Sequence, residues 1–222
     1  MSRLRSLSLF LTTVMLLLGF NQAWAEEKDR PRGRAGVFDY YLLSLSWSPE
    51  YCAGLRGEND PRQCHEGRRY GFVVHGLWPE YEEGYPQFCA GNPQVSSRLV
   101  EKMLPIMPSE NLIRHEWQKH GTCTGLTVEQ YFDKTKEAFA RVTIPARYKN
   151  PTTAITIEPR RLKQDLVAAN RQFTEGSFAV LCQGRFLSEV RVCLDKDLEP
   201  RSCSVDVRDS CRPEKIILRP VR

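Results

Sequence analysis

Eight cysteines constrain the fold of this chain more than any other feature of its sequence. They are spread over the chain at Cys52, Cys64, Cys89, Cys123, Cys182, Cys193, Cys203 and Cys211. An even number of cysteines in an oxidising compartment predicts disulfides, here four. Structural zinc is the alternative interpretation, but the sequence contains no C-x-x-C pair, which disfavours it. Eight cysteines allow about 105 pairings, so their number alone leaves the connectivity open.

The N-terminal residues have the pattern of a secretory signal peptide. Arg3 and Arg5 give a basic start, residues 7–20 are mostly apolar, and Ala23-Trp24-Ala25 matches an A-x-A cleavage site. The apolar run is short for a membrane span and contains polar residues, which favours a cleaved signal over a retained anchor. We therefore expect residues 1–25 to be removed and the mature protein to be periplasmic or secreted, without a membrane anchor.

The remaining residues, 26–222, have the size of one domain with its own hydrophobic core. The whole chain contains 32 Lys and Arg against 27 Asp and Glu. This modest positive excess suits a polyanionic partner, and an ordinary solvated surface explains it equally well. We expect the protein to be a monomer.

Strand patterns at both ends of this domain enclose a helical middle. Apolar runs rich in Tyr, Val, Ile and Phe predict strands over residues 38–47, 70–78, 178–183, 185–194 and 216–218. Pro79 is expected to end the second strand, and Gly184 to turn the hairpin between the third and the fourth. The polar stretches 51–69 and 80–92 are expected to be loops, the first of them held by a disulfide.

Helical patterns occupy the region between the strands. Apolar spacing predicts helices over residues 95–106, around His115, from Thr127 to Val142, and over 159–171. Thr127 is a capping residue with Gln130 in the first turn, and Pro159 is favoured at a first helical position. The order of elements predicts an α+β fold, with an antiparallel β-sheet core flanked by several helices in a disulfide-stabilised single domain.

Three of the four histidines fall in two short segments, FVVHGLWP at Phe72–Pro79 and HEWQKHGTC at His115–Cys123. Paired imidazoles are suited to acid–base chemistry near neutral pH. On a helix, Glu116 lies three residues before Lys119 and four before His120, so these three side chains can share one face. The combination of His, Glu, Lys and His within six residues indicates an active site.

Two alternatives apply to these histidines. His75 alone, at a strand end, would more often be structural, but its place in one of two histidine segments favours a functional role. The sequence HEWQKH superficially matches the zinc motif H-E-x-x-H, yet His115 and His120 are five residues apart instead of four. We therefore expect no metal ligands and no cofactor. The fourth histidine, His65, lies outside both segments and is expected at the surface or in a structural role.

The two segments resemble the two active-site segments of the ribonuclease T2 family, which comprises secreted, base-nonspecific, often acid-active endoribonucleases. The sequence LSLSWSPEYC at Leu43–Cys52 resembles the family's first strand and first half-cystine, and Gly84-Tyr85-Pro86 before Cys89 also matches. The resemblance covers most of the mature chain. It implies four disulfides, Cys52–Cys64, Cys89–Cys123, Cys182–Cys211 and Cys193–Cys203.

The resemblance also implies a role for each residue of the two segments. Metal-free RNA cleavage needs a base, an acid and a cation that stabilises the phosphorane. By resemblance, His120 is the base and His75 the acid of the cyclising step, although the residues alone leave this order open. Lys119 supplies positive charge, Glu116 orients or polarises the groups around the phosphoryl oxygens, and His115 contacts phosphate.

A first base-binding site is implied by the same comparison. Trp78 and Tyr85 resemble stacking aromatics, and stacking accepts any base because every base has a π-face. Glu80 stands where family members often have Asp or Asn at the base edge. The chain departs from the family at Leu112, Ile113 and Ser46, where aromatics or glutamine are common, so base preference at the downstream nucleotide stays open.

The implied function is an exported endoribonuclease that cleaves single-stranded RNA with little base specificity, through a 2′,3′-cyclic phosphate and without acting on DNA. The alternative is a catalytically inactive RNA-binding or defence protein on the same fold. Degenerate motifs would be expected in such a protein, whereas His75, Glu116, Lys119 and His120 are all present.

Overall fold

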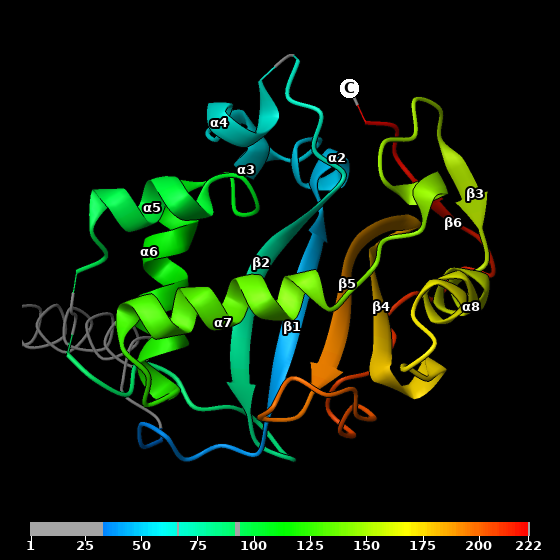
Figure 1. Cartoon of the computed structure of the whole chain (residues 1–222). Coiled ribbons are helices and arrows are strands. Elements are labelled where there is room, and N and C mark those ends of the chain that lie inside the picture. Colours follow the sequence, from blue (N-terminus) through cyan, green and yellow to red (C-terminus); the bar gives the residue numbers. More distant parts are fainter. Residues whose placement is uncertain (1–32, 66, 92–93, 222) are drawn as a thin grey trace, which may run out of the picture.

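The central feature of the fold is one β-sheet. The computed structural model describes residues 33–65, 67–91 and 94–221, so the expected signal peptide at 1–25 lies outside the described residues. In the described part, six strands form a sheet with the order β2-β1-β5-β6-β3, and β4 also pairs with β5 (Figure 1). The strands are β1 (Tyr40–Trp47), β2 (Phe72–Glu80), β3 (Ile155–Ile157), β4 (Phe178–Gln183), β5 (Phe186–Leu194) and β6 (Ile216–Leu218).

Most strand pairings are antiparallel, as the sequence predicts. The antiparallel pairs are β1 with β2, β1 with β5, β3 with β6, and β4 with β5. One short contact is parallel, where Phe186 of β5 pairs with Ile217 of β6. The predicted hairpin of β4 and β5 is present, and Gly184 turns it with a φ of 60°, a value that favours glycine. The predicted α+β class is confirmed.

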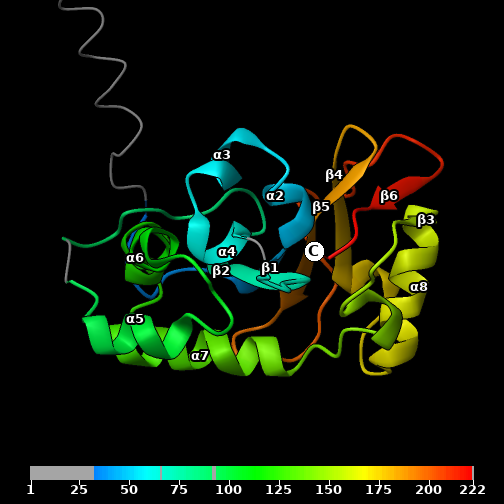
Figure 2. The ribbon, with the colours of Figure 1, turned by 90° about the horizontal axis from the view of Figure 1, so that it is seen from above.

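Helices flank this sheet. They are α2 (Ser48–Tyr51), α3 (Leu55–Glu58), α4 (Pro61–Cys64), α5 (Ser97–Met103), α6 (Glu110–Lys119), α7 (Val128–Ala140) and α8 (Pro159–Ala169). Helix α7 crosses one face of the sheet, α6 lies beside β2, and α8 lies near β3 and β4 (Figures 1 and 2). No helix among the described residues combines the length and the apolar character needed to cross a membrane.

Some predicted boundaries were wrong, and proline explains two of them. Residues 51–69 were expected to be a loop, but the chain between β1 and β2 forms α2, α3 and α4, and proline occupies the first turn of α2 and of α4. Pro79 does not end β2, which continues to Glu80. The sheet tolerates Pro79 because, among the described residues, β2 is an edge strand whose partner is β1. Strand β3 was not predicted.

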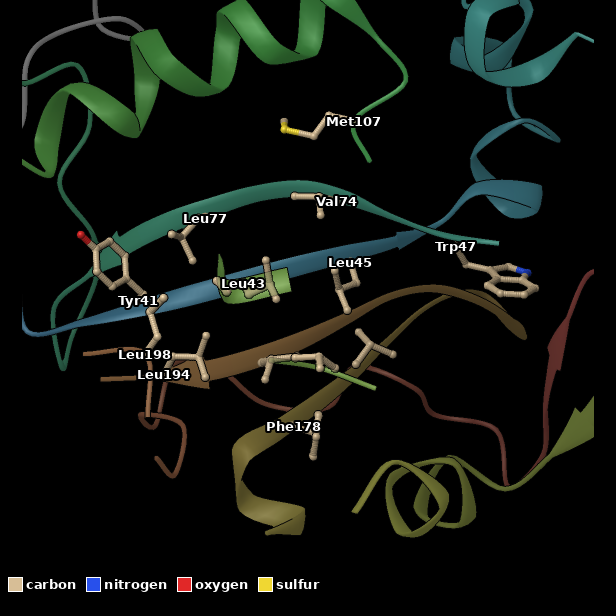
Figure 3. Close-up of a cluster of buried hydrophobic side chains, with 14 of the residues drawn as sticks. Tyr41, Leu43, Leu45, Trp47, Val74, Leu77, Met107, Phe178, Leu194 and Leu198 are labelled. Atoms are coloured by element: carbon tan, nitrogen blue, oxygen red, sulfur yellow. The ribbon is translucent and has the colours of Figure 1, made fainter. Parts of the chain in front are cut away.

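The hydrophobic core lies on one face of the central strands. Leu43 and Leu45 of β1 and Val74 and Leu77 of β2 point into it, and none of them is more than marginally exposed (Figure 3). Helix α7 adds Phe132 and further apolar side chains to the same cluster. Its start is fixed by the predicted cap, since Thr127 accepts from the backbone N–H of Gln130 while the Gln130 side chain accepts from that of Thr127.

The opposite face of the same strands has small side chains at its centre. The β1 residues that alternate with the core leucines include Ser44 and Ser46. Ser44 pairs with Gly76 of β2, whereas the next residue, Leu45, pairs with Val74. His75 is thus an extra residue in β2, a β-bulge, and bulges often redirect a side chain beside an active site.

Four disulfides join the described residues: Cys52–Cys64, Cys89–Cys123, Cys182–Cys211 and Cys193–Cys203. Each pair is the one that the family resemblance implies. Cys89–Cys123 connects the loop after β2 to the 3-10 turn after α6, so it links the two histidine segments. Two hydrogen bonds accompany it, from Phe88 N–H to the Lys119 carbonyl (2.8 Å) and from Cys89 N–H to Thr122 Oγ1 (3.2 Å).

Candidate active site

His75 lies at the bulge of β2 with a carboxylate near each ring nitrogen. Nδ1 is 3.3 Å from Oε2 of Glu189 on β5, and Nε2 is 3.7 Å from Oε1 of Glu116 on α6. The side chain is 35% exposed, so a substrate can reach it. Desolvation lowers the pKa of His75, but the hydrogen bond to Glu189 and the charges of both carboxylates outweigh this and raise the pKa above its ordinary value.

Glu116 is a buried carboxylate at the contact between α6 and β2. It lies on the buried face of α6 with Ile113 and Trp117 and is only 1% exposed. Oε2 accepts a 2.6 Å hydrogen bond from Nε1 of Trp78. Burial raises the pKa of Glu116 above its ordinary value, although the charge of His75 and the hydrogen bond from Trp78 oppose the shift.

This contact requires glycine at position 76. A Cβ on Gly76 would collide with Oε2 of Glu116 and with Nε1 of Trp78. The missing side chain therefore lets the Glu116 carboxylate approach the backbone of β2. The glycine of the FVVHGLWP segment is thus required by the packing of Glu116 from α6 and of Trp78 two residues further along β2.

His120 follows the last residue of α6 and is 4% exposed. Its backbone N–H donates to the Glu116 carbonyl (3.0 Å), and its ring stacks on Trp78 with centroids 5.0 Å apart and 23° between the planes. Nδ1 is buried and has no hydrogen-bond partner among the described residues. Burial, followed by the positive charge of Lys119, lowers the pKa of His120 well below its ordinary value.

The aromatic residues implied in base binding lie around His120. Tyr85 is 45% exposed, its ring centroid is 6.0 Å from that of His120, and Nζ of Lys119 is 5.8 Å from the Tyr85 centroid. Trp78 is less exposed. His75 packs edge-on against its ring, and the Arg191 guanidinium lies 5.3 Å from the ring centroid. Of the two aromatics, Tyr85 offers more surface to a substrate.

Glu80, the third residue of the implied base site, is the last residue of β2 and is 7% exposed. Burial raises its pKa to about 8, against the opposing positive charges of Arg191 and Lys119. Below that pH the carboxyl is neutral and can both donate and accept a hydrogen bond.

His115 lies on α6 beside a cleft of about 700 Å³ that also reaches His75. The cleft walls come from β1, β2, α6 and the α4 region and include Ser46, Val73, Leu112 and Arg62. Leu112 and Ser46, two of the residues that depart from the family pattern, therefore face the cleft. His65 lines a different pocket, as expected for a residue outside the site. No group of three or more His, Cys, Asp or Glu side chains among the described residues could hold a metal ion.

Two residues of this site were not predicted from the sequence, namely Glu189 and Arg191. Both lie on β5, where Nε of Arg191 donates to Oε1 of Glu189 at 2.6 Å. The available signal was a pair of opposite charges at alternate positions of a mostly apolar strand, FLSEVRVCL. Alternation places both side chains on the face of Ser44 and Ser46, which lie opposite them on β1.

A family model and a related protein both identify this chain as similar to ribonucleases. The model of the Ribonuclease T2 family matches residues 38–203. A ribonuclease from Aeromonas hydrophila is 34% identical over 217 residues, which cover 94% of this chain and 99% of that protein.

Solved structures share the fold at lower identity. An RNase-related protein from Calystegia sepium superposes with a TM-score of 0.67 at 22% identity, covering 83% of this chain and 98% of that one. RNase NT in complex with 5′-AMP gives 0.64 at 22% identity, covering 83% and 99%. The family model and the full-length relative together identify this chain as an endoribonuclease that belongs to the ribonuclease T2 family.

Proposed function

We propose that this endoribonuclease is exported and cleaves single-stranded RNA through attack of the 2′-oxygen on its own phosphorus, which leaves a 2′,3′-cyclic phosphate. Residues 1–25 are the signal peptide in this proposal, and residues 26–222 form one catalytic domain that acts as a monomer without a membrane anchor. The disulfides of the described residues support a periplasmic or secreted location.

The main support for the proposal comes from two histidines that contact the same tryptophan and whose pKa values are shifted in opposite directions. Both imidazoles contact the Trp78 ring, with centroid distances of 5.2 Å for His75 and 5.0 Å for His120. The pKa of His75 is raised and that of His120 is lowered. At one pH, therefore, His75 can carry a proton while His120 is neutral, which acid–base catalysis by two histidines requires.

The cyclising step follows from these protonation states. Neutral His120 takes the proton of the 2′-hydroxyl, the 2′-oxygen forms a bond to phosphorus, and the bond from phosphorus to the 5′-oxygen breaks. His75 gives its proton to the departing 5′-oxygen. In the hydrolytic step the roles reverse. Neutral His75 accepts a proton from water, whose oxygen forms a bond to phosphorus. The bond from phosphorus to the 2′-oxygen breaks, and His120 gives its proton to that oxygen.

The remaining groups stabilise the charge of the phosphorane or position the reacting groups. Lys119 supplies a positive charge that stabilises the phosphorane, and His115 contacts phosphate from the wall of the cleft. Glu116 is held by Trp78 beside Nε2 of His75, where it orients or polarises the groups around the phosphoryl oxygens.

Weak base specificity is supported by the groups at the base site. Tyr85 offers an exposed aromatic surface and Trp78 a partly covered one, and stacking on an aromatic ring tolerates every base. Glu80 is neutral below about pH 8 and can both donate and accept, which suits more than one base edge. The 5′-AMP complex of RNase NT supports nucleotide binding on this fold. Single-stranded RNA is favoured because its bases can leave the stack.

A chimeric oligonucleotide tests the proposal. We expect the purified mature protein to cut a DNA strand that contains one ribonucleotide only after that ribonucleotide, in the presence of EDTA. Mass spectrometry should find a 2′,3′-cyclic phosphate on the upstream fragment and a 5′-hydroxyl on the downstream fragment.

The matched controls are the same strand with deoxyribose, or with 2′-O-methylribose, at that position. Neither has the nucleophile, so both should resist cleavage. Cutting of either control, or products with 5′-phosphates that require a divalent metal, would contradict the proposed chemistry.

The disulfide that joins the two histidine segments gives a second prediction. Changing Cys89 and Cys123 together to serine should lower the stability by about 2–5 kcal/mol, which is typical for loss of a native disulfide. It should also lower kcat/KM by about tenfold or more in protein that remains folded, because misplacement of catalytic groups is costly. Thermal melts and RNA cleavage at a temperature well below the midpoint measure the two effects separately.

Changing Cys182 and Cys211 together to serine is the control for this experiment. This disulfide closes a loop of similar length, with a sequence separation of 29 instead of 34, and joins β4 to the C-terminal segment. We expect a similar loss of stability with a smaller loss of kcat/KM. Equal losses of kcat/KM in the two variants would show that Cys89–Cys123 has no special role in the site.

A further inference from the structure

Glu189 reaches His75 across an intervening strand. Strand β1 separates β5 from β2, and Ser46 of β1 pairs directly with Glu189. The short side chains of Ser44 and Ser46 leave room above β1, and the bulge in β2 offsets His75 from the regular register. The Glu189 carboxylate, whose side chain is 12% exposed, comes within 3.3 Å of Nδ1 of His75.

We propose that Glu189 is a positioning residue, whose carboxylate accepts a hydrogen bond from Nδ1 of His75 and so presents Nε2 to the 5′-oxygen of the substrate. This inference rests on the function proposed above, in which His75 is the acid of the cyclising step.

The direction of this hydrogen bond follows from the charge of Glu189, which its ion pair with Arg191 at 2.6 Å favours independently of His75. Burial alone would raise the pKa of Glu189, but the hydrogen bonds and charges of His75 and Arg191 lower it to about 2. An ionised carboxylate can only accept hydrogen bonds, so Nδ1 of His75 must carry the hydrogen. The hydrogen bond at one ring nitrogen fixes the tautomer of the imidazole and therefore the role of the other nitrogen.

Arg191 holds the carboxylate in place. Its Nε binds Oε1 of Glu189 at 2.6 Å, which leaves Oε2 for His75. The Arg191 guanidinium also lies over the Trp78 ring, so Arg191 contacts both Glu189 and a second residue of the site. The carboxylate of Glu189 is thus oriented before any substrate arrives.

Glu116 cannot replace Glu189 in this role. It faces Nε2, the nitrogen that must meet the substrate, at 3.7 Å, and its own Oε2 is bound to Trp78. The two carboxylates therefore have different functions toward one imidazole. Glu189 holds Nδ1 in both reaction steps, so that Nε2 donates a proton in the first step and accepts one in the second.

The charge around His75 comes from several elements. The charged or titratable groups that act on it are Glu189 and Arg191 on β5, Glu116 on α6 and His120 after α6. Further titratable groups line the cleft that reaches His75, namely Asp60, Arg62, Glu110 and His115. Among these groups, Glu189 is the one hydrogen-bonded to the ring, and that bond is the leading contribution that raises the pKa of His75.

Glu189→Gln tests the inference with two readouts. The amide has one acceptor oxygen for two donors, Nδ1 of His75 and Nε of Arg191, and it lacks the negative charge, so the hold on His75 is weakened and the alkaline limb of the kcat/KM profile should move to lower pH. We expect kcat to fall by about 10- to 100-fold, as for other losses of orientation, while KM changes much less. Titration of ¹³C-labelled histidines by NMR, with His75 assigned through His75→Ala, should show the His75 signal titrating at lower pH than in the wild type.

Two further variants complete the experiment. Glu189→Asp keeps the charge on a shorter side chain and should restore part of the His75 titration. Glu175→Gln makes the same chemical change near α8, where Glu175 pairs with Arg160, and should leave both readouts unchanged. Thermal melts of all variants confirm that they are folded.

The outcomes separate this inference from the proposed function. An unchanged His75 titration in Glu189→Gln, or a changed titration with wild-type kcat, would overturn the role of Glu189. If His75→Ala retained full activity, the proposed function would fail instead, and the NMR titration would still report whether Glu189 binds Nδ1.

Discussion

Replacing His120 with alanine is expected to lower kcat/KM for RNA cleavage by about 10²–10⁴-fold, and replacing His75 should have an effect of the same size. Each variant removes one of the two proton-transfer groups. The double variant should lose little more than either single variant, because groups that act in one transition state are not additive. Initial rates on a fluorescent RNA oligonucleotide, with circular dichroism to verify folding, measure these losses.

His65→Ala is the matched control for both variants. His65 is exposed, lies outside the two segments and lines a different pocket, so its removal should leave kcat/KM unchanged. A loss of less than about tenfold in both His75→Ala and His120→Ala would rule out acid–base catalysis by this pair.

The pH dependence assigns the two roles. In the wild type, kcat/KM should rise with pH as His120 loses its proton and fall as His75 loses its own. Since the pKa of His120 is lowered well below, and that of His75 is raised above, the ordinary histidine value of about 6.5, the acid limb should lie below that pH and the alkaline limb above it. The residual activity of His120→Ala should lack the acid limb, and that of His75→Ala the alkaline limb. The reverse assignment of limbs would exchange acid and base.

The parts of the fold that were predictable are those set by local sequence. The apolar run of β1, the Thr127 cap of α7 and the Gly184 turn of the β4–β5 hairpin each depend on a few neighbouring residues. Pro79 was misread because its effect depends on whether β2 is an edge strand, which only the assembled sheet decides. The disulfide pairs came from the family resemblance, since the number of cysteines leaves their pairing open.

The candidate site was predictable where its residues share a segment. Glu116, Lys119 and His120 lie within one helical turn and its end, so their proximity follows from the period of a helix. The contact of Glu189 with His75 spans 114 residues and depends on the order of three strands, on two serines and on a bulge. The resemblance suggests Trp78 as a stacking residue, but not that its indole N–H binds Glu116.

The contact of α6 with β2 leads to the second large prediction, which concerns Gly76. We expect Gly76→Ala to lower kcat/KM by about 100-fold or more, because displacement of a catalytic group by about 1 Å can cost that much. The added methyl group would collide with the Glu116 carboxylate and the Trp78 indole nitrogen. Overpacking of this kind typically costs about 1–3 kcal/mol of stability, so the variant should fold. Steady-state kinetics and a thermal melt measure the two effects.

The control for this variant is Gly91→Ala, because a Cβ at Gly91 would have no atom of the described residues within 4 Å apart from its chain neighbours. Its kcat/KM and melting temperature should match those of the wild type. Comparing the two variants separates the effect of the methyl group at position 76 from the general effect of replacing a glycine by alanine. Near wild-type kcat/KM in Gly76→Ala would mean that Glu116 can leave the β2 backbone without loss. Its hydrogen bond to Trp78 and its distance to His75 would then not matter for the reaction.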